Sequence, residues 1–156
     1  MGNNGQINFH TRLIDKATVK FSEDLFVNAL VNIINNARDA ISGQGSIWMT
    51  LELVGSTEVD NSILSNSSLF LRAEIVDDGP GIHPDLLDRV FDLFFTTKEN
   101  RGGSGLGLSM VKGFANEAGG VVSAENAQPY GARFTLIIPV TEYSSEKTFE
   151  PSRGAF

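Results

Sequence analysis

The clearest periodic segment of the chain lies between Ser22 and Gly43. Its apolar residues recur every three or four positions and form one face of an amphipathic helix, made of Leu25, Phe26, Ala29, Leu30, Ile33, Ile34, Ala37 and Ile41. Ser22 is a suitable N-cap, and Glu23 and Asp24 place negative charge in the first turn. Gly43 provides a stop, so we predict a helix that runs to about Ile41.

Apolar and polar residues alternate in several shorter segments, and these segments predict strands. The expected strands cover residues 46–54, 69–76, 121–126 and 133–140, with a further edge strand within residues 7–21. Two more helices are expected, at residues 84–91 and 105–118. This order of elements predicts an α/β fold, a two-layer α/β sandwich in which helices cover one face of a mixed, mostly antiparallel sheet.

Composition narrows the class of protein and its partners. The 156 residues suffice for one compact domain, which we expect at residues 7–140, between a flexible N-terminus (1–6) and a polar C-terminal tail or linker (141–156). The formal net charge is −7 and no basic run is present, so nucleic acid is not an expected partner. The chain has no cysteine for disulfides or metal binding, and no apolar run long enough to span a membrane.

The predicted first helix carries an unusual line of asparagines. Asn28, Asn32 and Asn36 are four positions apart and share one face, with Asn35 beside them. Asparagine costs a helix about 0.5–0.7 kcal/mol relative to alanine, so a face that only needs solvation has better choices. An amide oxygen is an uncharged hard ligand that suits Mg²⁺ already bound to a polyphosphate. Taken alone, a solvated, asparagine-rich face remains the alternative.

A second motif ends the strand predicted at residues 69–76. Asp77 follows that strand directly, and Gly79 and Gly81 come next. A carboxylate at a strand end can accept a hydrogen bond from an exocyclic amine, and neighbouring glycines let a flat ring approach the backbone. The alternative is a simple Pro-Gly turn with solvated acids.

A glycine-rich segment, residues 101–108, opens the last predicted helix. Its backbone N–H groups and the positive end of the helix can surround a small anion. A flexible hinge would also explain the glycines, but not Leu106 and Leu108, which we expect to anchor the start of the helix in the core. Upstream, Phe91, Phe94 and Phe95 could latch a lid to the core or simply belong to the core.

The order of these segments resembles one family. Residues 32–37, 77–82, 91–98 and 103–108 resemble the N box, G1 box, F box and G2 box of the ATP-binding catalytic domain of sensor histidine kinases. Residues 131–134 resemble its last glycine motif, although Ala132 stands where threonine is more usual. The resemblance covers about residues 19–139 and implies a Bergerat-type sandwich with a mobile ATP lid at about residues 83–104.

The resemblance assigns a role to each motif residue. Asp77 would bind the adenine amino group, Asn36 would coordinate Mg²⁺, and Asn32 would support the metal or phosphates. Lys98 and Arg101 are candidate cations for the phosphates. The expected catalytic residues are Asn32, Asn36 and Lys98. The expected nucleotide-binding residues are Asp77, Gly79, Gly81, Ile82, Phe95, Arg101, Gly103, Ser104, Gly105, Leu106, Gly107 and Leu108. Asp39 departs from the family, because many histidine kinases carry a basic residue there that faces the phosphates.

Asn32 also separates two branches of the wider superfamily. The gyrase, heat-shock chaperone and mismatch-repair ATPases carry a glutamate at that position, which activates water. An amide takes up no proton near neutral pH, so Asn32 cannot be that base. The resemblance therefore implies a protein-histidine kinase that transfers the γ-phosphate of ATP to a separate domain. A nucleotide-binding regulatory module without transfer, and a hydrolytic ATPase, are the alternatives.

The partners follow from the same resemblance. The acceptor histidine would lie on a helical-hairpin domain, because His10 and His83 lack that context. The chain would be an excised catalytic domain or a protein acting in trans, and a response regulator receiver domain would act downstream. We expect the isolated domain to be monomeric and cytoplasmic, although the parent protein could be membrane-anchored.

Overall fold

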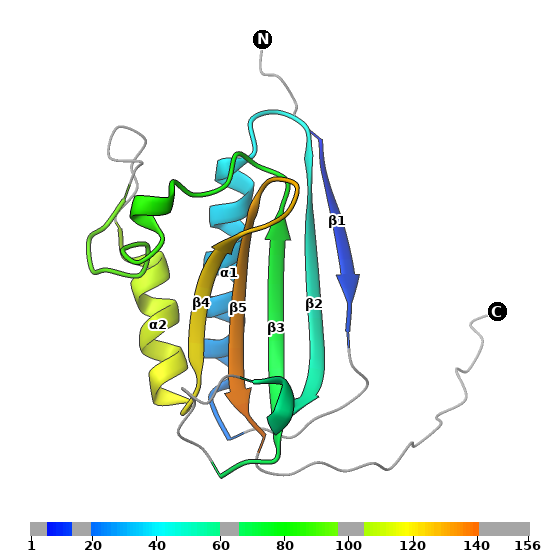
Figure 1. The fold of residues 1–156 in the computed structure, drawn as a ribbon. Coiled ribbons are helices and arrows are strands. Elements are labelled where there is room, and N and C mark those ends of the chain that lie inside the picture. The colour runs from blue at the N-terminus through cyan, green and yellow to red at the C-terminus, as the bar shows by residue number, and fades with distance from the viewer. Residues whose placement is uncertain (1–5, 14–19, 60–65, 97–104, 141–156) are drawn as a thin grey trace, which may run out of the picture.

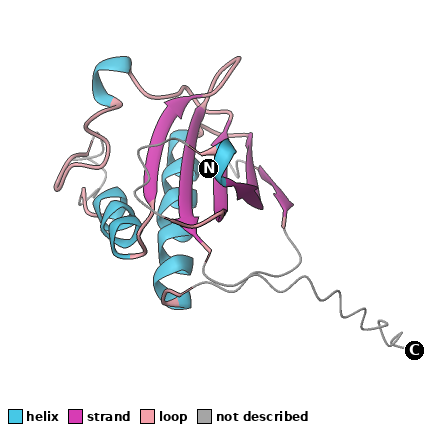
Figure 2. Ribbon diagram, turned by 60° about the horizontal axis from the view of Figure 1, so that its bottom comes forward, coloured by secondary structure: helices cyan, strands magenta, loops and turns pink. Residues whose placement is uncertain are grey.

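The computed structural model describes residues 6–13, 20–59, 66–96 and 105–140. In this part of the chain a five-stranded sheet carries two helices on one face (Figures 1 and 2). The elements are β1 (Ile7–Arg12), α1 (Glu23–Ala40), β2 (Gly45–Gly55), β3 (Leu69–Asp77), α2 (Gly107–Glu117), β4 (Val121–Asn126) and β5 (Ala132–Pro139), with short 3₁₀ turns η1 (Ser56–Glu58) and η2 (Pro84–Leu86). The two-layer α/β sandwich predicted from the sequence is confirmed.

The strand order places distant parts of the chain next to each other. The sheet runs β1-β2-β3-β5-β4, with β1 parallel to β2 and every other pair antiparallel. The sheet is thus mixed and mostly antiparallel, and β1 is an edge strand, both as expected. Because β3 pairs with β5, Val76 lies opposite Arg133, and the end of β3 meets the start of β5. This junction positions the site described below.

The core lies between the sheet and the two helices. Helix α1 begins at an N-cap, where the Ser22 hydroxyl accepts a hydrogen bond from the N–H of Leu25 at 3.4 Å. Its buried residues are Ala29, Ile33 and Ala37, and alternate residues of β5 point to the same core. Burial of these apolar side chains is the main source of stability for both layers.

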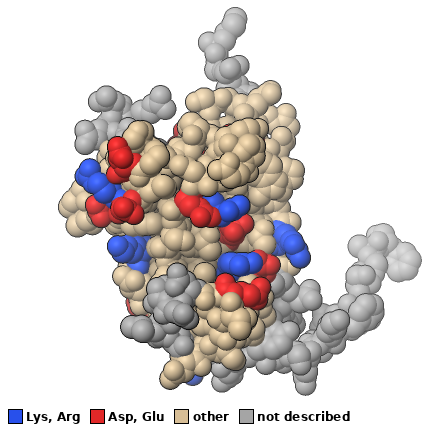
Figure 3. Space-filling view, in the orientation of Figure 1, with Lys and Arg blue, Asp and Glu red and all other residues tan. Residues whose placement is uncertain are grey.

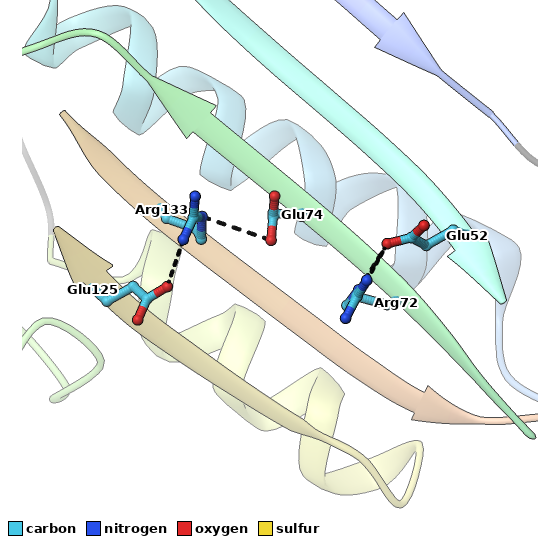
Figure 4. A network of polar contacts seen from close by, with 5 residues as sticks. All are labelled: Glu52, Arg72, Glu74, Glu125 and Arg133. Carbon is cyan, nitrogen blue, oxygen red and sulfur yellow. Dashed lines mark hydrogen bonds and ion pairs between the residues drawn. The ribbon is translucent and has the colours of Figure 1, made fainter. Parts of the chain in front are cut away.

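The face of the sheet away from the helices carries charged side chains (Figure 3). Arg133 on β5 donates to Glu125 on β4 at 2.9 Å and lies 3.6 Å from Glu74 on β3 (Figure 4). Arg72 on β3 pairs in the same way with Glu52 on β2. Cross-strand pairs of opposite charge stabilise a sheet modestly and keep this face polar.

One predicted helix is wrong. Residues 84–91 form the 3₁₀ turn η2 followed by further turns, because their backbone hydrogen bonds span three residues rather than four. Leu86 donates to His83, Leu87 to Pro84 and Arg89 to Leu86. An α-helix of eight residues barely repays its nucleation cost, so the local turns prevail. Among the described residues, no helix is both long enough and apolar enough to cross a membrane.

Candidate functional site

A cavity of about 420 Å³ opens between α1, the end of β3, the turns after it and the start of α2. Its lining comes from four segments of the chain, within residues 32–40, 77–96, 105–108 and 132–134. The lining residues are Asn32, Asn35, Asn36, Asp39, Ala40, Asp77, Gly81, Ile82, His83, Leu86, Val90, Phe95, Thr96, Gly105, Gly107, Leu108, Ala132 and Phe134. Asp77 and Asn36 thus share one cavity, which mixes polar groups with an apolar floor. This composition is typical of a small-molecule site.

Asp77 is the buried acid of the cavity, with only 2% of its surface exposed. Its Oδ1 accepts hydrogen bonds from the N–H groups of Gly79, at 2.8 Å, and Ala132, at 3.3 Å. Burial raises the pKa of the Asp77 carboxyl above its ordinary value, these two hydrogen bonds oppose the rise, and the charge of Asp78 adds to it. No residue in the described ranges donates to Oδ2, so that oxygen can accept a hydrogen bond from a ligand.

The glycines after Asp77 allow this close packing. A Cβ on Gly79 would lie 2.9 Å from Oδ1 of Asp77. Gly81 has φ +80°, and a Cβ there would lie 2.7 Å from Oδ1 of Asn126. A side chain at either position would therefore displace the loop that forms one wall of the cavity.

Asn126, the last residue of β4, holds this loop in place. Its Oδ1 accepts from the N–H of Ile82 and its Nδ2 donates to the Ile82 carbonyl, both at 2.7 Å. The pair of bonds imitates one rung of a β-ladder and fixes Ile82 at the cavity wall. Asn126 was not among the predicted site residues, because an asparagine before a turn is too common to point to any partner.

The asparagine line of α1 forms the polar wall. Asn32, Asn35 and Asn36 line the cavity, whereas Asn28, one turn earlier, is exposed and does not. A Cβ on Gly107 would lie 3.7 Å from Oδ1 of Asn32, so the start of α2 faces this end of the line. The described residues contain no cluster of three acidic or histidine side chains. A few amide oxygens still fit Mg²⁺, which takes most of its ligands from water and phosphate.

The glycine-rich segment enters the cavity at Gly105 and Gly107. Gly105 has φ +69°, and a Cβ there would collide with the backbone of Phe94. Gly107 begins α2, so the unpaired N–H groups and the positive end of that helix lie at the cavity wall. This arrangement favours negative charge near Asn32.

The three phenylalanines have different environments. Phe91 packs edge-on against Phe134 in the core, with ring centroids 6.2 Å apart. Phe95 lines the cavity, and the Arg89 guanidinium lies 5.1 Å from the centre of its ring. Phe94 is 68% exposed and has φ +61°, which is unusual for a non-glycine residue. Two of the three therefore belong to the core or the cavity, and one points outward.

The predicted site residues divide into three groups. Those lining the cavity are Asn32, Asn36, Asp77, Gly81, Ile82, Phe95, Gly105, Gly107 and Leu108. Gly79 does not line the cavity, but its N–H donates a hydrogen bond to Oδ1 of Asp77. Leu106 is 37% exposed and also lies outside the cavity lining. Lys98, Arg101, Gly103 and Ser104 lie outside the described residues.

The expectation that both Leu106 and Leu108 anchor α2 in the core is wrong for Leu106. Leu108 packs against the core, whereas Leu106 precedes the helix as its N-cap. Residues two positions apart lie on nearly opposite sides of a helix, so only one of them can face inward.

Other lining residues were absent from the predicted site. Asp39 and Ala40 belong to α1, and His83 and Thr96 belong to the segment between β3 and α2. Ala132 and Phe134 arrive from β5 through its pairing with β3. Helical spacing could have suggested Asp39, but the contribution of β5 depends on the strand order.

Comparisons with known proteins agree with this geometry. Residues 22–142 match the family model described as "Histidine kinase-, DNA gyrase B-, and HSP90-like ATPase". The sensor kinase CckA of Brucella abortus is 36% identical over 125 residues, which are 78% of this chain and 13% of that protein. The sensory histidine kinase/phosphatase NtrB of Rhodobacter capsulatus is 32% identical over 117 residues, 75% of this chain and 32% of that protein.

Solved structures show the same architecture. The mycobacterial sensor histidine kinase MprB aligns with a TM-score of 0.68 and 26% identity, over 86% of this chain and 82% of that one. The catalytic domain of the histidine kinase ThkA aligns with a TM-score of 0.67 and 27% identity, over 86% and 80%. The chain spans only 13% to 32% of the length of the two curated relatives above. On these matches and on the cavity, the chain belongs to the family of histidine kinase-, DNA gyrase B- and HSP90-like ATPases.

Proposed function

We propose that this chain is the ATP-binding catalytic domain of a two-component sensor histidine kinase. It binds ATP together with Mg²⁺ and transfers the γ-phosphate to a histidine on a separate helical-hairpin domain. The observation that carries the proposal is that Asp77 and Asn36, from different elements, line the same cavity. A carboxylate for the base and an amide for the metal are then available to one ligand.

Adenine fits the end of the cavity around Asp77. The exocyclic amine of adenine donates hydrogen bonds, and the Asp77 carboxylate accepts them. Ile82 and Phe134 supply apolar surface for a flat ring at the same cavity. Because Asp77 is buried, a hydrogen bond to it is stronger than one formed in water.

The phosphates fit the opposite end, where α2 begins. Gly105 and Gly107 bring backbone N–H groups to the cavity, and the positive end of α2 favours negative charge. Asn36 would hold Mg²⁺, with Asn32 beside it. Bound there, Mg²⁺ would neutralise part of the phosphate charge. The chain's own residues then hold the triphosphate in one orientation, which is most of what phosphoryl transfer requires.

Transfer is favoured over hydrolysis by the identity of residue 32. Asn32 occupies the wall next to Gly107, where a general base for water would have to lie. Its amide cannot accept a proton near neutral pH. The nucleophile therefore comes from another domain.

Exposed apolar side chains near the cavity offer a surface for that domain. Leu93 and Phe94 are 63% and 68% exposed, and Met110 on α2 is 60% exposed. Phe94 touches Gly105, so the two segments that carry these side chains are in contact. Such a group of exposed apolar residues is typical of a protein interface. A solved complex of the histidine kinase ThkA with the response regulator TrrA, similar to this chain with a TM-score of 0.63, supports a receiver domain as the next partner.

Calorimetric titration with a non-hydrolysable ATP analogue, with and without Mg²⁺, tests the first half of the proposal. We expect binding that strengthens with Mg²⁺ and a rise in the melting temperature of the protein. No heat and no thermal stabilisation would refute nucleotide binding.

Mixing the domain with histidine-bearing helical-hairpin domains and labelled ATP tests the second half. An acid-labile phosphate on the partner is expected, and none on His10. Binding without any transfer across a panel of such domains would favour the alternative, a nucleotide-binding regulatory module. Release of inorganic phosphate without a partner would instead favour an ATPase.

A further inference from the structure

Arg133 lies near the start of β5, between two residues that line the cavity. Ala132 and Phe134 face the cavity, and side chains alternate along a strand, so Arg133 points to the opposite face of the sheet. There its Nη1 donates to Oε1 of Glu125 on β4 at 2.9 Å. Its Nε lies 3.6 Å from Oε2 of Glu74 on β3 (Figure 4). One side chain thus links three strands behind the cavity.

The strand register shows that this link lies where the ladders end. In the described part of the chain, the last rung between β3 and β5 pairs Val76 with Arg133. The last rung between β4 and β5 pairs Asn126 with Ala132, and the rung before it pairs Glu125 with Arg133. The ends of an element open more readily than its centre, so a bridge across three strands has most effect at this point.

The hydrogen bonds that shape the base end of the cavity lie just past these rungs. Asp77 follows Val76, and its Oδ1 accepts from the N–H of Ala132 at 3.3 Å. Asn126 holds the backbone of Ile82 through two hydrogen bonds of 2.7 Å. Each of these bonds joins a side chain to a backbone group of another segment. Their lengths therefore depend on how the three strand ends are spaced.

We propose that Arg133 is a positioning residue of the nucleotide site, which bridges Glu74 and Glu125 and so holds Asp77 and Ile82 in the arrangement that binds adenine. This inference rests on the proposed function, because it takes adenine as the ligand beside Asp77. Arg133 acts from the other face of the sheet and does not touch the nucleotide. Its effect is on the fraction of molecules in which the base end of the cavity is correctly formed.

The expected size of the effect follows from the strength of such a bridge. If the strand ends separate for part of the time, only the remaining fraction of molecules binds, and the apparent affinity falls by that fraction. A partly exposed ion pair of the stronger kind is equivalent to a factor of about five in an equilibrium constant. A loss of this size is readily measured by calorimetry.

The test titrates a non-hydrolysable ATP analogue, at fixed Mg²⁺, into the wild type, Arg133→Gln and Arg72→Gln. Glutamine keeps part of the aliphatic stem and removes the charge. We expect Arg133→Gln to bind the analogue about fivefold more weakly than the wild type. In the ligand-free protein, the amides of Ala132 and Ile82 should exchange hydrogen about fivefold faster, because their partners are held less firmly.

Arg72→Gln is the matched control. Arg72 pairs with Glu52 directly across two strands on the same face of the sheet, nearer the start of β3. The Arg72 and Arg133 side chains are similarly covered, 29% and 36% exposed, and neither arginine lines the cavity. This variant loses the same charge, but it should keep the wild-type affinity and the wild-type exchange at Ala132 and Ile82. Equal changes in both variants would attribute the effect to general sheet stability, and would overturn the inference.

Other outcomes separate the inference from the proposed function. If the wild type does not bind the analogue, the proposed function fails and the inference falls with it. If the wild type binds and Arg133→Gln binds equally well, only the role of Arg133 is wrong. Glu125→Gln removes one partner of Arg133 and should give the same two changes at a smaller size. If Arg133→Gln does not fold, wild-type affinity and exchange in Glu125→Gln would overturn the inference.

Discussion

At the scale of single residues, the buried carboxyl of Asp77 lowers the stability of the folded chain. Its carboxyl is buried, and burial raises its pKa even though Gly79 and Ala132 donate hydrogen bonds to it. A raised pKa means that the ionised form is less favourable in the folded chain than in the unfolded one. At neutral pH the charge of Asp77 therefore destabilises the fold, a cost that the proposed role of this carboxylate in nucleotide binding would explain.

The variant Asp77→Asn should show this exchange directly. The side-chain oxygen of asparagine can still accept from Gly79 and Ala132, but it carries no charge. We expect a higher melting temperature than wild type at pH 7. The gain should shrink as the pH falls from the raised pKa of the folded chain toward the ordinary pKa of aspartate, and it should vanish below that value, where Asp77 is neutral in the folded and the unfolded chain alike. Thermal melts of the ligand-free protein across this pH range measure the effect.

The same variant should bind ATP weakly. An amide can present a donor where the adenine amine needs an acceptor, so we expect a loss of at least about tenfold in affinity. The response to Mg²⁺ should persist. A less stable Asp77→Asn at pH 7, or unchanged ATP affinity, would contradict the role assigned to this carboxylate.

At the scale of elements, helix α1 contributes both to the core and to the cavity. Its apolar face holds Ala29, Ile33 and Ala37 in the core, and its flank presents Asn32 and Asn36 to the cavity. The helix tolerates poor helix formers on that flank because tertiary burial of the other face stabilises it. Asn28 belongs to the same line in sequence but lies outside the cavity lining.

Asn28 and Asn36 therefore form a matched pair of positions. Asn36→Ala should weaken nucleotide binding in the presence of Mg²⁺ far more than in its absence, because it removes the expected metal ligand. Asn28→Ala should leave binding unchanged and stabilise the helix by about 0.5 kcal/mol. Calorimetry with and without Mg²⁺, together with denaturant melts, measures both. Equal losses of affinity in the two variants would show that the asparagines act only through the stability of the helix.

At the scale of the whole molecule, the two faces of the sheet carry different groups. One face carries α1, α2 and the cavity, and the other carries the ion pairs centred on Arg72 and Arg133 (Figure 4). The exposed Leu93, Phe94 and Met110 belong to the segments that border the cavity. A partner that docks there would reach the phosphate end of the site.

Substitution of Met110 tests this surface. Met110→Asp should lower the rate of phosphate transfer to a helical-hairpin partner about tenfold or more, because a charge replaces an apolar contact. It should leave ATP affinity unchanged, since Met110 does not line the cavity. Lys112→Asp changes charge at another exposed position of α2 and serves as the control. A transfer rate that Met110→Asp leaves at the wild-type value would place the docking surface elsewhere.

Much of the fold could be predicted because its information is local. The apolar spacing of residues 25–41 specified α1 to within one residue at its C-terminal end, and alternation located the strands. The helix predicted at residues 84–91 was wrong. The apolar spacing of this segment suits an α-helix, but the segment is too short for an α-helix to be more stable than a series of turns. Among the site residues, those carried by recognisable motifs were named, and supporting residues such as Asn126 were not.

The sequence by itself determined the chemistry available to this protein: a line of amides on one helix, an acid at a strand end and a glycine-rich entry to a second helix. Only the tertiary structure decided which of these groups meet. The pairing of β3 with β5 brings Ala132 to Asp77 and Phe134 to the cavity. Asn28, one turn before Asn32 on α1, and Leu106, the N-cap of α2, lie outside the cavity lining. Local spacing specifies the face on which a side chain lies, whereas its neighbours depend on strand order and register, which no single segment encodes.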